Sequence, residues 1–96
     1  MGERRAIVEA KRAEIVAAVH RHRGRSVAVF GSVARGDDTT VSDIDLLVEF
    51  EPGSSLFDLL HLQGHLALIV SGPVDVVSTG GLTDRDDHIR REAVPL

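Results

Sequence analysis

The stretch SVAVFGSVARGDDTTVSDIDLLVEF, residues 26–50, decides the fold. It opens with a β-branched run, 26–30, which predicts a short buried strand that ends at Gly31. A turn-rich segment of glycine, aspartate and threonine follows, and a second strand is expected over 44–50. The short link between these strands favours antiparallel neighbours.

Regular elements are also expected on both sides of this stretch. Helix-forming residues over about 3–22 predict a helix that Gly24 ends. A second helix is expected over 56–70, and a third strand over 74–78. Thr83 and Asp86 resemble a capping box for a final helix that reaches Arg91. The order is therefore α-β-β-α-β-α, an α+β fold.

The composition is that of one compact domain, and we expect a single domain over residues 1–96. A hydrophobic fraction of 43% suffices for one modest core, and 27% charged residues is ordinary for a folded protein. The chain contains no cysteine, which excludes disulfides and thiolate metal sites. No apolar run approaches the roughly 20 residues that span a bilayer, so we expect a cytoplasmic protein.

The charge is distributed unevenly along the chain. Residues 1–36 carry eight Lys/Arg and three Asp/Glu, whereas residues 37–96 carry three and twelve, so the net charge of -4 is the sum of about +5 and -9. A nucleic-acid-binding domain usually has a basic surface and aromatic side chains for base stacking, and this chain has three Phe and no Tyr or Trp. Direct nucleic-acid binding is therefore not expected.

Three aspartates in strand context are the candidate metal ligands. Asp43 and Asp45 are two residues apart where the second strand begins, so their side chains should share one face, about 7 Å apart at Cα. Asp75 is a single acid among valines in the third strand. Like charges brought together on apolar strands need a compensating cation. Mg²⁺ suits this role, because it prefers hard oxygen ligands and is often shared with phosphates.

The turn after the first strand is a candidate phosphate-binding site. Gly31 has no side chain, so backbone N–H groups can approach phosphate oxygens, and the Ser32 hydroxyl can donate a further bond. The segment 31–36 lacks the Gly-Lys-Ser/Thr ending of a Walker A loop. Arg35 could hold a triphosphate or merely line the loop, and the sequence leaves both open.

Other polar clusters have simpler interpretations. The basic residues 20–23 close the last turn of the first helix, where cations oppose the helix dipole. His61 and His65 have the spacing of a zinc pair, but the helix lacks the glutamate of a metalloprotease, and we expect surface or rim histidines. Asp84, Asp86 and Asp87 are expected to cap the last helix.

Together, the segments GSVARG (31–36), SDIDLLV (42–48), VDVV (74–77) and IRREAV (89–94) resemble nucleotidyltransferases built on the polymerase-beta-type palm. More narrowly, they resemble the minimal nucleotidyltransferases (MNT) that are the antitoxins of HEPN/MNT toxin-antitoxin systems. The resemblance extends from about residue 6 to the end of the chain. It implies a mixed three-stranded core sheet in the order 1-2-3 with flanking helices.

The resemblance also implies a reaction: AMP passes from ATP to a hydroxyl and pyrophosphate leaves. In the antitoxin members the acceptor is a tyrosine of a HEPN toxin, an RNase that the modification silences. By motif position, Asp43 and Asp45 would hold two Mg²⁺ ions, and Asp75 would be a third ligand that activates the hydroxyl. Gly31 and Ser32 would bind phosphate.

The small size of the chain leaves no residues for a separate acceptor-binding domain, so we expect a protein partner to position its own hydroxyl. Two alternatives stay open. The chain could neutralise a toxin by binding alone, with a vestigial nucleotide site, although the intact acidic triad disfavours this. It could also modify a small molecule or an RNA end, which the acidic charge disfavours.

Overall fold

A computed structural model describes residues 2–39 and 41–96, and a mixed sheet lies at its centre. The strands are β1 (Gly24–Phe30), β2 (Ile44–Phe50), β3 (Val74–Ser78) and β4 (Val94–Pro95), in the order β3-β2-β1-β4. β2 is antiparallel to β1 and parallel to β3, while the short β4 is antiparallel to β1. The predicted α+β class and the order of the three predicted strands are confirmed, and β4 is an addition.

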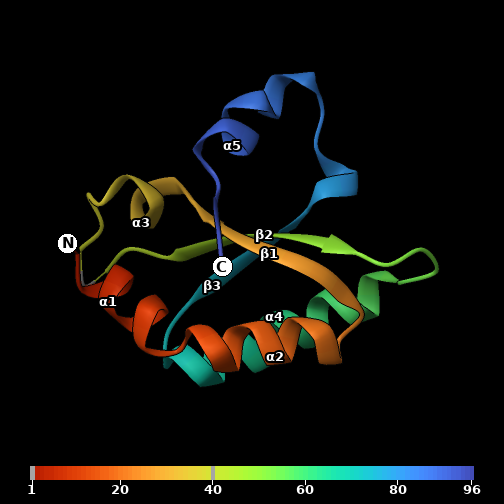
Figure 1. Cartoon of the computed structure of the whole chain (residues 1–96), viewed down its shortest axis with the longest axis horizontal. Coiled ribbons are helices and arrows are strands. Elements are labelled where there is room, and N and C mark those ends of the chain that lie inside the picture. The colour runs from red at the N-terminus through yellow and green to blue at the C-terminus, as the bar shows by residue number, and fades with distance from the viewer. Residues whose placement is uncertain (1, 40) are drawn as a thin grey trace.

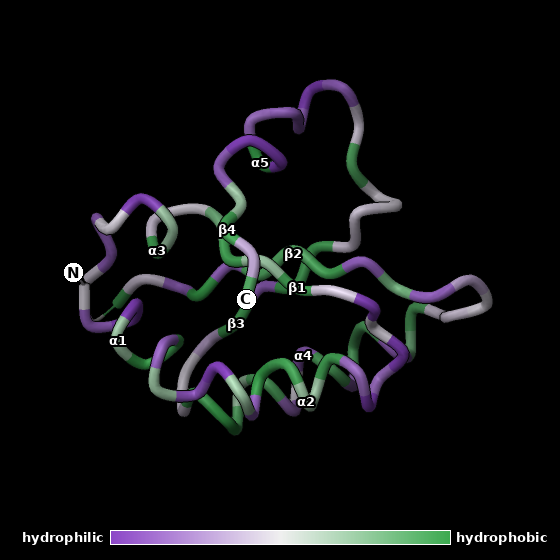
Figure 2. The backbone as a smooth tube through the Cα atoms, in the orientation of Figure 1, coloured by the Kyte–Doolittle hydropathy of each residue, from purple (hydrophilic) through white to green (hydrophobic). Residues whose placement is uncertain are grey.

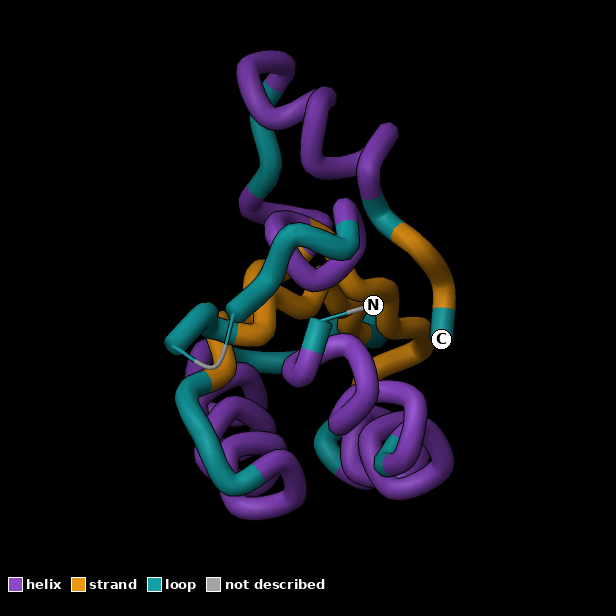
Figure 3. The backbone as a smooth tube through the Cα atoms, turned by 90° about the vertical axis from the view of Figure 1, so that its left-hand side faces the viewer, coloured by secondary structure: helices purple, strands orange, loops and turns teal. Residues whose placement is uncertain are grey.

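The helices form a layer on each side of the sheet. They are α1 (Glu3–Ala10), α2 (Arg12–Arg21), α3 (Gly31–Arg35), α4 (Leu56–Val70), the 3-10 turns η1 (Thr79–Gly81) and η2 (Asp84–Asp86), and α5 (Asp87–Glu92). The long helices α2 and α4 cover one face, and α3 and α5 lie on the other side (Figure 1). The same layers are visible in the view turned by 90° (Figure 3). Within the described residues, no helix combines the length and the apolar character that are needed to cross a membrane.

Strand alternation decides which side chains enter the core. Ile44, Leu46 and Val48 of β2 are fully buried and face α2 and α4, which leaves the intervening positions to the opposite face. Leu62 and Leu66 of α4 are also fully buried. The strands and α4 are rich in hydrophobic residues, whereas the segment around α5 is mostly hydrophilic (Figure 2). The main core therefore lies between the sheet and the α2–α4 layer.

The N-terminal helix differs from its prediction, because two helices meet at Lys11 instead of one continuous helix. Helix α2 ends before Gly24, and the residue with left-handed backbone geometry is Arg23, at φ 70°. Gly24 is already part of β1, and a Cβ there would collide with Cγ1 of Val19. This glycine therefore allows a close approach of α2 to the sheet.

Candidate active site

Asp45 and Asp75 are direct neighbours in the sheet. They are register partners in the parallel pair β2–β3, and neighbouring strands are about 4.8 Å apart. Their flanking residues, including Val74 and Val76, are buried in the core, so both carboxylates project from the opposite face. Asp43 lies just before β2 and is exposed. The fold thus places two of the predicted acids side by side and the third two residues away.

The electrostatics of Asp45 reflect this cluster. Partial burial raises the pKa of Asp45, and the charges of Asp75 and Asp43 raise it further, while Arg35 opposes the shift. Burial and nearby like charges both disfavour an ionised carboxyl group. A bound cation would relieve that cost.

Gly31 links β1 to this cluster. It follows Phe30, which is the register partner of Asp45, and it has a positive φ of 70°. A Cβ at this position would collide with Oδ2 of Asp45. Both its backbone conformation and its close packing therefore require glycine, and the start of α3 is held against the Asp45 carboxylate.

Ser32 lies in the first turn of α3, where the backbone N–H groups have no intrahelical acceptor. Phe30 precedes the helix and provides no side-chain cap. Such uncapped N–H groups are suited to phosphate oxygens. The expectation of a glycine-serine phosphate-binding turn is compatible with this geometry, although the segment is a short helix and not only a turn.

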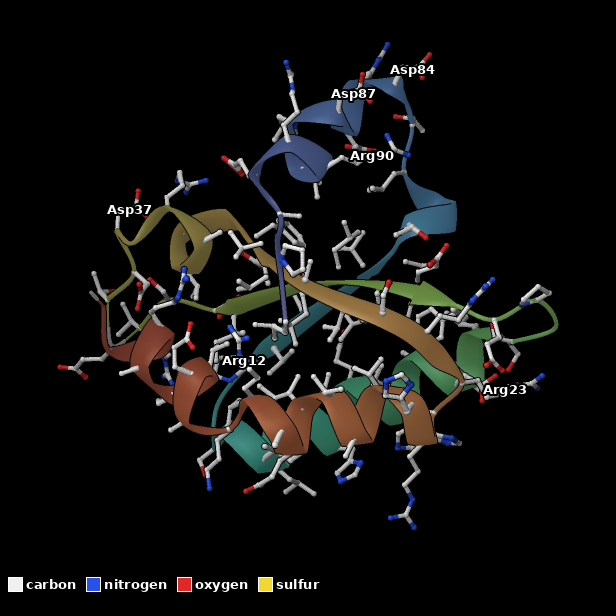
Figure 4. The ribbon with its side chains drawn as sticks, viewed as in Figure 1. Arg12, Arg23, Asp37, Asp84, Asp87 and Arg90 are labelled. Atoms are coloured by element: carbon white, nitrogen blue, oxygen red, sulfur yellow. The ribbon has the colours of Figure 1, made fainter. Side chains whose placement is uncertain are left out.

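Arg35 ends α3 and points to the C-terminal segment. Its Nη1 donates to Oε1 of Glu92 at 3.0 Å, and its Nε donates to Oδ2 of Asp37 at 3.3 Å. Asp37 lies on the loop that follows α3 (Figure 4). Since Arg35 also acts on the pKa of Asp45, it is near the acidic cluster, but its contacts in this structure connect α3 to α5.

Of the three acids expected to cap the last helix, Asp86 alone makes a capping bond, and it closes a capping box with Thr83 at the 3-10 turn η2, whereas α5 itself has no side-chain cap. The backbone N–H of Thr83 donates to Oδ2 of Asp86 at 3.0 Å, and this bond is the main cause of the lowered pKa of Asp86. Asp84 and Asp87 lie on the outer part of the α5 segment, and Oδ1 of Asp87 accepts a bond of 3.0 Å from Nη1 of Arg90 (Figure 4).

Asp38 is a supporting residue that the sequence reading missed. It is buried, and its Oδ2 accepts bonds from the backbone N–H groups of Arg4 at 2.7 Å and Arg5 at 3.2 Å. It therefore caps α1 from the loop before β2. The guanidinium of Arg5 in turn donates to the carbonyl of Val33 in α3, at 3.2 Å. In the sequence, Asp38 looks like an ordinary turn residue, because its partners are more than thirty positions away.

Gln63 supports the strand that carries Asp75. Its Oε1 accepts a bond of 3.1 Å from the backbone N–H of Val76. β3 is an edge strand, so this N–H would otherwise lack a partner in the sheet. No local sequence signal identifies this contact, which joins α4 to β3.

The acidic cluster fits a divalent ion by its donors and by its backbone placement. Across residues 2–39 and 41–96, however, no three acidic or histidine side chains are grouped closely enough to hold a metal ion as they stand. Asp45 and Asp75 are already in register, so side-chain rotation, without any strand movement, would bring their oxygens together. The oxygen donors are those that Mg²⁺ prefers.

Comparisons with known proteins agree with this geometry. The family model described as nucleotidyltransferase domain matches residues 12–94. A protein of Methanocaldococcus jannaschii, provisionally named a protein adenylyltransferase, is 38% identical over 91 residues, which are 94% of this chain and 97% of that protein. A solved structure of a provisionally named minimal nucleotidyltransferase is 41% identical, with a TM-score of 0.87, over 96% of this chain and 95% of that one.

A more distant structure shares the fold. It is the complex of tri-AMPylated Shewanella oneidensis HEPN toxin with an MNT antitoxin, and the match has 18% identity and a TM-score of 0.59. The match covers 78% of this chain and 58% of the other chain. The family model and the two more similar proteins confirm the resemblance seen in the motifs of the sequence, and the chain belongs to the nucleotidyltransferase domain family.

Proposed function

We propose that the chain transfers AMP from ATP to a tyrosine hydroxyl of a partner HEPN toxin and thereby acts as its antitoxin. The observation that carries this proposal is the register pairing of Asp45 with Asp75 beside the start of α3. The similarity to the Methanocaldococcus protein supports adenylyl transfer. The Shewanella complex supports an HEPN partner, since in it an AMPylated HEPN toxin is bound to an MNT antitoxin.

Each residue of the site has a proposed role. Asp43 and Asp45 would hold Mg²⁺, with Asp75 as a further ligand, and the bound ions would neutralise charge on the triphosphate. The N–H groups at Gly31 and Ser32 would orient phosphate oxygens. The raised pKa of Asp45 supports a cluster that is completed by cations.

The reaction follows from this arrangement. The tyrosine oxygen would attack the α-phosphorus of ATP, its bond to phosphorus would form, and the bond from that phosphorus to the pyrophosphate oxygen would break. The exposed carboxylate of Asp75 would accept the hydroxyl proton. A partner that presents its own tyrosine would supply the orientation that the reaction needs.

The test uses purified chain, Mg²⁺, ATP labelled in its α-phosphate, and a HEPN-family RNase as the acceptor. Label should appear on the HEPN protein, and its RNase activity should fall. The double variant D43N/D45N should bind the partner but transfer no label. If this variant neutralises the RNase at full strength, neutralisation is by binding alone. If the label appears only on RNA or on a small molecule, the proposed acceptor is wrong.

A further inference from the structure

Two histidines from different helices meet on the side of the molecule away from the acidic cluster. His22 directly follows α2, His65 lies in α4, and these helices cover the sheet face opposite Asp45 and Asp75 (Figure 1). Nε2 of His22 is 3.2 Å from Nδ1 of His65, and the rings lie edge to face at an interplanar angle of 74°. The reaction proposed above makes no use of this pair.

The distance between the two nitrogens fits a metal ion held by both. Imidazole nitrogens bind Zn²⁺ at about 2.0–2.1 Å, and two such bonds with their nitrogens 3.2 Å apart enclose an angle of about 100°. This angle is close to that of a tetrahedral site. Imidazole is also a preferred ligand for zinc and neighbouring transition metals, in contrast to the carboxylates that suit Mg²⁺.

The surroundings leave room for further ligands. The pair borders a shallow hollow that is also lined by Arg21 and Leu68. His61 precedes His65 by four residues on α4, so it lies one turn away along the same side of the helix. In this structure His61 is not grouped with His22 and His65. Water molecules would occupy the remaining coordination positions of the ion unless the His61 side chain rotates towards it.

The electrostatic surroundings are compatible with a neutral ligand. Partial burial is the largest cause that lowers the pKa of His22, followed by the charges of His65, Arg21 and His61, while Asp58 opposes them. A neutral imidazole keeps the lone pair that a metal needs. The same surroundings also suit a plain hydrogen bond between the rings, so the two arrangements must be separated by experiment.

We propose that Nε2 of His22 and Nδ1 of His65 bind a zinc-class divalent ion that joins the end of α2 to the middle of α4. The site is separate from the acidic cluster and differs from it in ligand chemistry. The bound ion would have a structural effect, because a ligand that binds only the folded chain increases the free energy of unfolding. The proposal does not depend on the proposed function.

Thermal unfolding of the whole chain tests this site. Excess Mg²⁺ is present throughout to occupy the carboxylates, and ZnCl₂ is then added. At about ten times its dissociation constant, Zn²⁺ should raise the unfolding temperature by roughly 5 °C or more. H22A and H65A should each lose this shift. H20A is the matched control, since His20 is an exposed histidine of α2, and it should keep the shift.

A second measurement avoids any folding defect of the variants. Nitrogen NMR of the wild-type imidazoles should show the resonances of His22 and His65 shifting together until one equivalent of Zn²⁺ is bound, with those of His20 and His88 unchanged. The proposal would be overturned if Zn²⁺ does not change the unfolding temperature of the wild type, or if it raises that of H22A and H65A as much as that of the wild type. Equal shifts of all histidine resonances would do the same.

Discussion

Replacement of Asp45 by Asn removes one charge from the acidic cluster and should stabilise the fold when no divalent cation is present. Two unit charges about 5 Å apart repel by about 0.8 kcal/mol in water and by about 3 kcal/mol at an effective dielectric constant near 20. Asp75 is exposed and Asp45 is half-buried, so the lower figure applies, and we expect a gain of about 1 kcal/mol. For a domain of this size, the unfolding temperature should rise by about 4–8 °C.

The pH dependence of this gain has a definite sign. The folded-state pKa of Asp45 is raised, by burial first and then by Asp75 and Asp43. The ionised group therefore destabilises the wild type at pH values above its raised pKa. The cost disappears as the pH falls through that pKa and below the ordinary value of 3.8, where both folded and unfolded chains are protonated. The advantage of D45N should thus be present at neutral pH and absent in acid.

Magnesium should reverse the order of stability. At about ten times its dissociation constant, a ligand that binds only the folded state contributes about 1.4 kcal/mol, which the wild type should gain and D45N should not. The assay is calorimetric unfolding with and without Mg²⁺. E49Q is the matched control, because Glu49 is an exposed acid of the same strand and face. If the unfolding temperature of D45N in metal-free buffer is equal to that of the wild type or lower, the acidic cluster is not repulsive.

Three further substitutions test the supports of the site by urea unfolding. G31A should lower the free energy of unfolding by about 1–3 kcal/mol and abolish AMP transfer, because the added Cβ meets the Asp45 carboxylate. G36A is the control, since Gly36 also has a positive φ but has open space around it, and this variant should keep its activity. D38A removes the cap of α1 and should cost about 1–2 kcal/mol, with faster amide exchange at the start of α1; unchanged exchange would contradict the cap. Q63L leaves a β3 backbone N–H unpaired and should cost about 1 kcal/mol; equal stability would show that water replaces this bond.

Much of the fold was predictable because its signals are local. The strand-forming runs predicted the observed bounds of β2 and β3 and the observed end of β1. The capping residues predicted the position of α4. Alternation along the strands placed Asp45 and Asp75 opposite the core side. The break at Lys11 had no such signal, since the sequence on both sides favours a helix.

The chain's sequence by itself determined the three acids, the glycine-serine turn and the strands that carry them, because residue type and a two-residue period suffice for these features. Only the tertiary structure decided that Asp45 and Asp75 are in register, that Asp38 caps α1, that Arg35 contacts Glu92 and that His22 meets His65. Each of these is a contact between residues far apart in sequence. Such contacts depend on how helices and strands pack together, and no local pattern encodes the geometry of that packing.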